Sequence, residues 1–334
     1  MSTKSGFNRF LSSNNCRRQT LQLHRASINQ PRRHYAANSL TSSDASFSGP
    51  QDPDSYCRDF VRKHDRDSYM TIQFFPRSLQ ASCFAVKAFY AELATIQDSV
   101  SNPLIGQMKM QFWKDAIKSR ASPQHPIAIA LHNAIKTSHI APYHLNRIIE
   151  ARDVELNSPS HLSMDTLLAH AESTSSTLNY ILLSILGLSS SESYSHAASH
   201  LGVSQTLSTL LRALPYHTSK GTMVIPASIT AKHGVNQEDV FRRGPAAEGI
   251  NDAVYEFAVV ANDHLITARE MFKEDGGYRV PTEAMPVFLG AIPVQNYLTR
   301  LEKADFNAFD PKLQLRAAIQ LPWLIWRGYY KSSF

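Results

Sequence analysis

The chain has 334 residues, of which 43% are hydrophobic, and its 34 Lys and Arg against 28 Asp and Glu give a formal net charge of +6. This composition is that of a globular protein with a sizeable core, and no apolar run reaches the roughly 18 residues of a membrane-spanning helix. Seven basic residues precede Asp44, the first acid, and removing these seven charges from +6 leaves −1 for the remainder. The body of the chain therefore lacks the basic surplus of a nucleic-acid-binding domain, and we expect no nucleic-acid partner.

The N-terminal tail is typical of a mitochondrial targeting segment. It is rich in Arg and Ser, carries no acid before Asp44, and interleaves apolar residues such as Phe10 and Leu21. We predict a disordered transit peptide over residues 1–37, a flexible linker rich in Ser, Pro and Asp over 38–54, and a folded domain over 55–334. The alternative for the tail is a basic arm that binds nucleic acid or a membrane surface.

Helical periodicity dominates the predicted domain. Apolar residues recur at intervals of three or four in residues 88–101 and 201–217. Further helical patterns cover residues 106–119, 127–138, 143–156, 164–186, 251–272 and 312–328, with Pro or Gly near several of their ends. The one short strand-like run is 223–225, so we predict an all-α fold.

Two pairs of residues flank the apolar faces of 88–101 and 201–217. At about 100° per residue, Gln97 and Ser101 lie about 90° from the first apolar stripe, and Ala213 and His217 lie similarly beside the second. Flanks of this kind suit the wall of a cavity between two helices, whereas Asp98 projects nearly opposite its stripe. The alternative is that all of them are ordinary positions in a helical core.

Both segments resemble the squalene and phytoene synthase family. In that family each segment carries two Asp residues four apart, which hold Mg²⁺ against a substrate diphosphate; the matching positions here are Gln97 and Ser101, then Ala213 and His217. Ser228, in the stretch 224–228, stands where the family has a further Asp. Because Mg²⁺ requires anionic oxygen ligands, the resemblance implies a single large helical domain of isoprenoid synthase type with a central cavity, but no metal, no cofactor and no catalytic residues, that is, a pseudoenzyme.

The resemblance extends over residues 56–329 and is specific to one branch of the family, the complex I assembly factor 6 branch. It is carried by the stretches 92–94 leading to 98–101, 108–114, 125–128, 171–176, 212–217, 304–306 and 309–311. It implies a mitochondrial matrix protein, peripheral to the inner membrane, whose partners are complex I subunits or other assembly factors.

Three residues of the second segment and its continuation carry positive charge or can acquire it: Arg212, His217 and Lys220. They form a candidate cationic wall for an anion or a lipid in the cavity. The alternative for Arg212 is an ion pair with a nearby acid. The aromatic C-terminus, which includes Trp323, Trp326 and Tyr330, is expected to pack on the domain, with a partner subunit or the membrane interface as the alternative contact.

Other chemistries find no support in the chain. The His residues are scattered without the spacing of a zinc site, and no Gly-rich phosphate loop or Ser-His-Asp arrangement stands out. The leading hypothesis is a non-catalytic complex I assembly factor. The alternatives are an active prenyl transferase with unusual metal ligands and a prenyl-lipid-binding protein.

Overall fold

The computed structural model describes residues 52–100, 102–119, 124–273, 277–315 and 319–334. All of them belong to the second of the two units into which the chain divides, Gly49–Phe334. The predicted transit peptide over 1–37 and nearly all of the predicted linker over 38–54 lie outside the described residues and stay predictions.

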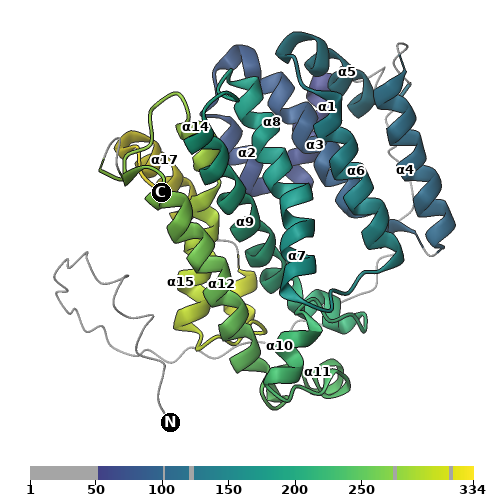
Figure 1. Cartoon of the computed structure of the whole chain (residues 1–334), viewed down its shortest axis with the longest axis vertical. Helices are drawn as coiled ribbons and strands as arrows, with labels where there is room; N and C mark the ends of the chain where they lie inside the picture. Colours follow the sequence, from purple (N-terminus) through teal and green to yellow (C-terminus); the bar gives the residue numbers. More distant parts are fainter. Residues whose placement is uncertain (1–51, 101, 120–123, 274–276, 316–318) are drawn as a thin grey trace, which may run out of the picture. The chain divides into compact units, whose positions relative to one another are not determined.

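The described residues form helices and connecting turns (Figure 1). The bounds are α1 (Pro53–His64), α2 (Arg66–Ile72), α3 (Arg77–Ser99), α4 (Pro103–Lys118), α5 (Pro126–Ser138), α6 (Pro142–Asn157), α7 (Met164–Ala171), η2 (Glu172–Ser176), α8 (Thr177–Ile185), α9 (Glu192–Ser219), α10 (Ala227–Lys232), α11 (Gln237–Arg243), η3 (Gly244–Ala246), α12 (Ile250–Glu270), α14 (Met285–Phe288), α15 (Ala291–Lys303), α16 (Pro311–Gln314) and α17 (Gln320–Lys331). Since none of the described residues forms a strand, the all-α prediction is confirmed.

Local chemistry explains where several helices begin and end. The Asp52 carboxylate accepts a hydrogen bond of 3.1 Å from the Ser55 amide, so α1 begins at Pro53, two residues before the predicted start of the domain. Three further helices, α4, α5 and α6, open with a proline, whose missing N–H is not needed in the first turn. The α5 helix ends at Ser138, and the residue that follows, His139, takes the left-handed conformation with φ 50°.

Two long helices, α3 and α9, form the centre of the domain. In Figure 1, α9 runs through the middle, with α12 and α15 on one side and α8 on the other, and all three pack against it. The α3 helix packs against α1, α5, α6 and α8. Most residues of the predicted apolar stripes are buried: Phe89, Leu93, Leu207 and Leu211 are at most 1% exposed, whereas Val100 and Leu210 are half-buried. Each such side chain contributes about 1.5–3 kcal/mol when it leaves water.

One strand-like run forms no strand, and one predicted helix differs from the structure. Residues 223–225 are not a strand: they are a buried connection between α9 and α10, and their apolar character reflects that burial, since no strand lies beside them in the described parts of the chain. The predicted helix over 312–328 is interrupted. The backbone turns extended at Leu315, with φ −69° and ψ 127°, so α16 ends at Gln314 and α17 begins at Gln320.

The predicted helix over 164–186 is continuous but not uniform. Between α7 and α8, the segment η2 has the wider π-helical turn, a form that often marks functional sites. This segment packs directly on α9 at Gly202, where an added Cβ would collide with the backbone of Ser176. Glycine therefore allows the two helices to approach closely.

Candidate functional site

A cavity of about 400 Å³ lies between α3 and α9, and its wall includes residues of α2, α6, α7, η2, α8, α14 and α15. Its lining combines apolar side chains, among them Ile72, Phe75, Leu178 and Leu182, with charged and hydroxyl-bearing ones. Its size and mixed lining are those of a site for a small ligand.

The structure brings several of the predicted site residues to this cavity. Gln97 from α3 and Ala213 and His217 from α9 all line it and are half-buried. Ser101 lies outside the described residues. Ser228 does not line the cavity: it is exposed, and its amide donates a hydrogen bond of 3.0 Å to the Leu162 carbonyl.

Acidic side chains do reach the cavity, but each of the three is engaged. The Asp65 carboxylate caps α2 by accepting from the Ser68 amide at 3.0 Å, Asp67 pairs with Arg212, and Glu155 pairs with Arg152. Within the described residues, no three His, Cys, Asp or Glu side chains stand close enough together to hold a metal ion.

The three residues of the predicted cationic wall have different surroundings: Arg212 and His217 line the cavity and Lys220 does not, and anion or lipid binding by them stays a prediction. Arg212 is exposed, and its guanidinium lies 2.9 Å from the Asp67 carboxylate. This residue therefore forms an ion pair with an acid, which was the alternative to anion binding. Lys220 does not line the cavity: its ammonium lies 3.7 Å from Asp98 and 4.6 Å from the centre of the Tyr216 ring. Burial lowers the pKa of His217, which keeps the imidazole neutral near pH 7. Arg212 and Lys220 are thus each paired with an acid, and His217 carries no charge near pH 7.

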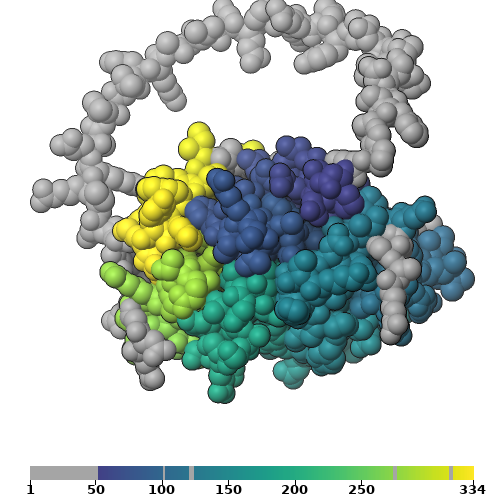
Figure 2. Space-filling view, turned by 90° about the horizontal axis from the view of Figure 1, so that it is seen from above, coloured from purple at the N-terminus to yellow at the C-terminus, as the bar shows by residue number. Residues whose placement is uncertain are grey.

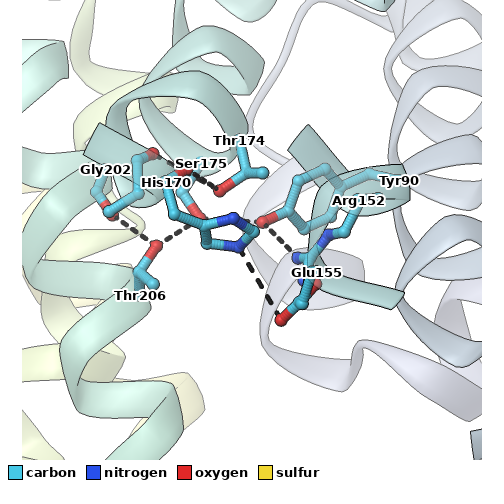
Figure 3. A network of polar contacts seen from close by, with 9 residues as sticks. Tyr90, Arg152, Glu155, His170, Thr174, Ser175, Gly202 and Thr206 are labelled. Carbon is cyan, nitrogen blue, oxygen red and sulfur yellow. Dashed lines mark hydrogen bonds and ion pairs between the residues drawn. The ribbon is translucent and has the colours of Figure 1, made fainter. Parts of the chain in front are cut away.

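A different polar network crosses the cavity wall (Figure 3). The Tyr90 hydroxyl lies 2.8 Å from Ser175 Oγ and accepts a hydrogen bond of 3.1 Å from Arg152. The second Nη of Arg152 donates to Glu155 at 2.7 Å. From α9, the Thr206 hydroxyl donates a hydrogen bond of 2.7 Å to the same Ser175 Oγ. The network therefore joins α3, α6, η2 and α9 by their side chains.

Electrostatics in this network favour a charged pair beside a neutral histidine. Burial opposes ionisation of Glu155, but Arg152 and His170 outweigh it and lower the Glu155 pKa. Burial likewise opposes the charge on Arg152, yet Glu155 and Tyr90 raise its pKa. His170 Nε2 is 3.8 Å from Glu155, and burial lowers the His170 pKa to about 4 in spite of that carboxylate.

Sequence reasoning missed Arg152, Glu155 and His170 because they come from separate helices and share no local motif. It also missed Lys87, which lines the cavity from α3. The signal for Lys87 was present, since it is the only charge in the apolar run 83–91.

The chain is similar to known proteins over nearly all of its described residues. The family model for squalene/phytoene synthase matches residues 61–323. The rat protein named NADH dehydrogenase (ubiquinone) complex I, assembly factor 6 is 38% identical over 295 residues, which is 86% of each chain. The human protein of the same name is 35% identical over 322 residues, 96% of this chain and 94% of that one.

The fold has a solved counterpart. A dehydrosqualene synthase crystallised with a ligand superposes with a TM-score of 0.69 at 17% identity, covering 84% of this chain and 98% of the other. This likeness confirms the predicted isoprenoid synthase type of fold. The chain therefore belongs to the squalene/phytoene synthase family, in the branch of the relatives named complex I assembly factor 6.

Proposed function

We propose that this protein is a mitochondrial assembly factor for respiratory complex I, built on a synthase fold. The observation that carries the proposal is the similarity to relatives of that name, which extends over nearly the whole of both chains and so includes the cavity. Its partners are then complex I subunits or other assembly factors, and it works in the mitochondrion.

We further propose that the cavity has no prenyl transferase activity. In the family resemblance, Gln97, Ala213 and His217 occupy positions of Mg²⁺-binding Asp residues, and all three line the cavity. An amide, a methyl group and a neutral imidazole cannot supply the anionic oxygens that Mg²⁺ requires, so no metal would neutralise a departing diphosphate. The acids that do line the cavity are held by a helix cap or by arginines.

The matrix location and the contact with the inner membrane are also proposals, and α17 supports the second. Three aromatic residues on this helix are exposed: Trp323 by 54%, Trp326 by 51% and Tyr330 by 69%. The helix has no acid, and the Arg327 guanidinium lies 5.5 Å from the centre of the Trp323 ring. Exposed Trp and Tyr beside basic residues suit the headgroup region of an anionic bilayer. No helix within the described residues is long and apolar enough to cross a bilayer.

The rest of α17 packs on the domain, and this packing holds the exposed aromatic face in place. Tyr329 lies 4.9 Å from Phe74, ring centre to ring centre, and Ile325 is 1% exposed. In the space-filling view the yellow C-terminal residues lie against the blue residues of the N-terminal helices (Figure 2). One side of the helix therefore packs on the domain through Ile325 and Tyr329, whereas Trp323, Trp326 and Tyr330, which were expected to pack, lie on the other side and are available to a bilayer.

Deletion of the gene tests the assembly role. Native gels of mitochondrial membranes should show loss of complex I with the other respiratory complexes retained, and the full chain should restore complex I. A deletion strain with normal complex I, but with altered sterol, carotenoid or quinone levels, would refute the proposal and favour a prenyl transferase.

Flotation with vesicles tests the membrane contact. The purified chain should float with vesicles that contain anionic phospholipid and should float less with neutral ones. Trp326→Ser with Tyr330→Ser should reduce flotation severalfold, whereas Tyr143→Ser should not, although Tyr143 on α6 is 67% exposed and so matches Tyr330 closely. Equal flotation of all these proteins would exclude α17 as the contact.

A further inference from the structure

Two histidines meet where α9 and α12 pack against each other. Nδ1 of His200 on α9 lies 2.8 Å from Nδ1 of His264 on α12, and the ring centres are 5.0 Å apart. The two helices lie side by side (Figure 1), and a hydrogen bond of 2.6 Å from the Ser204 hydroxyl to the Ala261 carbonyl joins them one turn further along α9. Both imidazoles are half-buried, and neither lines the central cavity. The packing of the helices therefore holds the pair in position while solvent can still reach it.

The two imidazoles are in the protonation state that binds metal ions. Burial lowers the pKa of both, the charge of His196 lowers the pKa of His200 further, and that of His200 lowers the pKa of His264. Both rings are then neutral near pH 7, and in the hydrogen bond one Nδ1 donates its proton to the lone pair of the other. If the donating ring moves this proton to its own Nε2, both Nδ1 lone pairs become available to a metal ion.

The distance between the two nitrogens fits a single ion. With metal–nitrogen bonds of about 2.0–2.1 Å, two ligands at an angle of about 90–110° are about 2.8–3.4 Å apart. The observed 2.8 Å falls at the short end of this range, so the rings need little movement to bind one ion together. Imidazole nitrogen suits Zn²⁺, Cu²⁺ and Ni²⁺, whereas Mg²⁺ prefers oxygen ligands.

His196 can supply a third nitrogen. It precedes His200 by four residues on α9, so the two lie on one face of the helix, the spacing of histidine pairs in helical metal sites. Its side chain is exposed and forms no hydrogen bond or ion pair with any residue that the structure describes. In the described conformation it does not complete a three-ligand cluster, since no three such side chains stand close enough together in the described ranges. Rotation of this exposed side chain about its χ angles is therefore the one rearrangement that the site needs.

A fixed negative charge beside the pair favours a cation. Glu172 of η2 raises the pKa of both His200 and His264, against the larger effect of burial. Burial opposes ionisation of Glu172 itself, but hydrogen bonds from Ser199 and Tyr180, of 2.7 and 2.6 Å, lower its pKa. The carboxylate therefore stays ionised, and its oxygens are already bonded to these hydroxyls.

We propose that His200, His264 and His196 bind one divalent first-row transition-metal ion, of the class of Zn²⁺, Cu²⁺ and Ni²⁺, outside the central cavity. Water fills the remaining coordination positions. The bound ion links α9 to α12 in place of a single hydrogen bond and so stabilises the folded chain. Histidine spacing in the sequence predicts no zinc site, because His200 and His264 are 64 residues apart and meet only through the packing of the two helices.

Titration of the full chain, without an affinity tag, with ZnCl₂, CuCl₂ or NiCl₂ tests the proposal. Calorimetry should show saturable binding of one ion per chain, and an excess of Mg²⁺ should not compete. The ion should raise the midpoint of thermal unfolding. Electron paramagnetic resonance of the Cu²⁺-loaded chain should show coordination by the nitrogens of at least two imidazoles.

Substitutions assign the ligands. His200→Asn and His264→Asn should each weaken binding at least tenfold and remove the shift of the midpoint, and His196→Asn should weaken binding severalfold. His139→Asn, at the exposed residue that follows α5, is the matched control and should bind like the wild type. His264→Cys keeps a metal ligand at the same position and should retain Zn²⁺ binding, which separates loss of a ligand from loss of the fold.

Absence of saturable one-to-one binding by the wild type would overturn the proposal, and this measurement needs no variant to fold. Wild-type affinity in His200→Asn or His264→Asn would overturn it as well, because the ion would then be held elsewhere. Undiminished binding by His196→Asn would refute the three-histidine site. These outcomes are independent of the proposed assembly role, which the deletion strain tests.

Discussion

The guanidinium of Arg152 donates a hydrogen bond of 3.1 Å to the hydroxyl of Tyr90 and lies 5.3 Å from the centre of the same ring. The two residues are 62 positions apart in the sequence, on α6 and α3. Because the other end of the guanidinium is bonded to Glu155, this contact connects a buried ion pair to the helix that carries Gln97. The stability of the domain and the shape of the cavity are therefore coupled at Arg152.

Removal of Glu155 should be strongly destabilising. Glu155→Ala leaves the buried Arg152 charge without its carboxylate, and we expect a loss of about 3 kcal/mol in the free energy of unfolding, measured by urea denaturation. The double variant Arg152→Met with Glu155→Leu should recover a large part of that loss, since it removes both charges.

An exposed ion pair provides the control for this prediction. Glu238→Ala breaks the Arg242–Glu238 pair on α11, whose side chains are 74% and 62% exposed, and it should change stability by less than about 1 kcal/mol. If Glu155→Ala were as mild as Glu238→Ala, the ion pair would not stabilise the cavity wall as described.

Gly202 should not tolerate a side chain. Gly202→Ala places a methyl group against the backbone of Ser176 in η2, and relief of that collision requires α9 and η2 to separate. Overpacking of this kind costs about 1–3 kcal/mol, which a thermal or urea unfolding curve would detect.

Gly106 on α4 is the matched position. There an added Cβ meets only the flexible side chains of Leu156 and Val100, and alanine also favours the helix, so Gly106→Ala should be close to neutral. Equal effects at the two positions would show that the contact between η2 and α9 is not as close as described.

Local periodicity explains why much of the fold could be predicted. The stripe of Phe89, Leu93 and Ile96 repeats within one helix, and each such residue is buried as its spacing requires. The π-helical turn of η2 could not be predicted in this way, because one wider turn leaves the apolar pattern of 164–186 almost unchanged. Its cause is tertiary: Gly202 on α9 and the buried hydroxyls of Thr174, Ser175 and Ser176 meet there.

The candidate site was predictable only in part, for a similar reason. Gln97 and His217 could be placed on a cavity wall from their own helices. Arg152, Glu155 and His170 come together only when α6 and α7 are positioned by the fold, so no spacing in the sequence relates them. The pairing of Arg212 with Asp67, 145 residues away, likewise depends on tertiary structure.

His170 should make the protein less stable in mild acid. Its pKa is about 4 in the folded protein, against 6.5 for an unperturbed histidine, because of burial. The unfolded chain therefore binds more protons between these values, and stability falls as pH decreases through this range. The contribution of His170 amounts to about 2 kcal/mol between pH 7 and pH 5. The lowered pKa of Glu155 acts in the same direction, since its contribution is also lost as pH falls.

Urea unfolding at pH 7 and pH 5 measures this effect. His170→Gln should show a smaller loss of stability between the two pH values than the wild type, whereas His139→Asn, at an exposed helix end, should show the full loss. An unchanged pH dependence in His170→Gln would mean that this imidazole is protonated in the folded protein at pH 5.

Restored carboxylates should restore metal binding if the cavity wall is arranged as the family resemblance implies. The variant with Gln97→Asp, Ser101→Asp, Ala213→Asp and His217→Asp should bind Mg²⁺, measured by calorimetry, whereas the wild type should not. A control with two Asp substitutions on the exposed face of α4, at Gln107 and Gln111, should not bind either. Failure of the fourfold variant to bind Mg²⁺ would show that these side chains do not converge.

The most direct test of a synthase fold without synthase chemistry is turnover of a prenyl diphosphate. The purified chain is incubated with farnesyl diphosphate and Mg²⁺ or Mn²⁺, and released pyrophosphate and prenyl products are measured. We predict neither product above the level of a metal-free control. Metal-dependent turnover, particularly if Asp98→Asn abolished it, would contradict the account and identify the protein as an active enzyme.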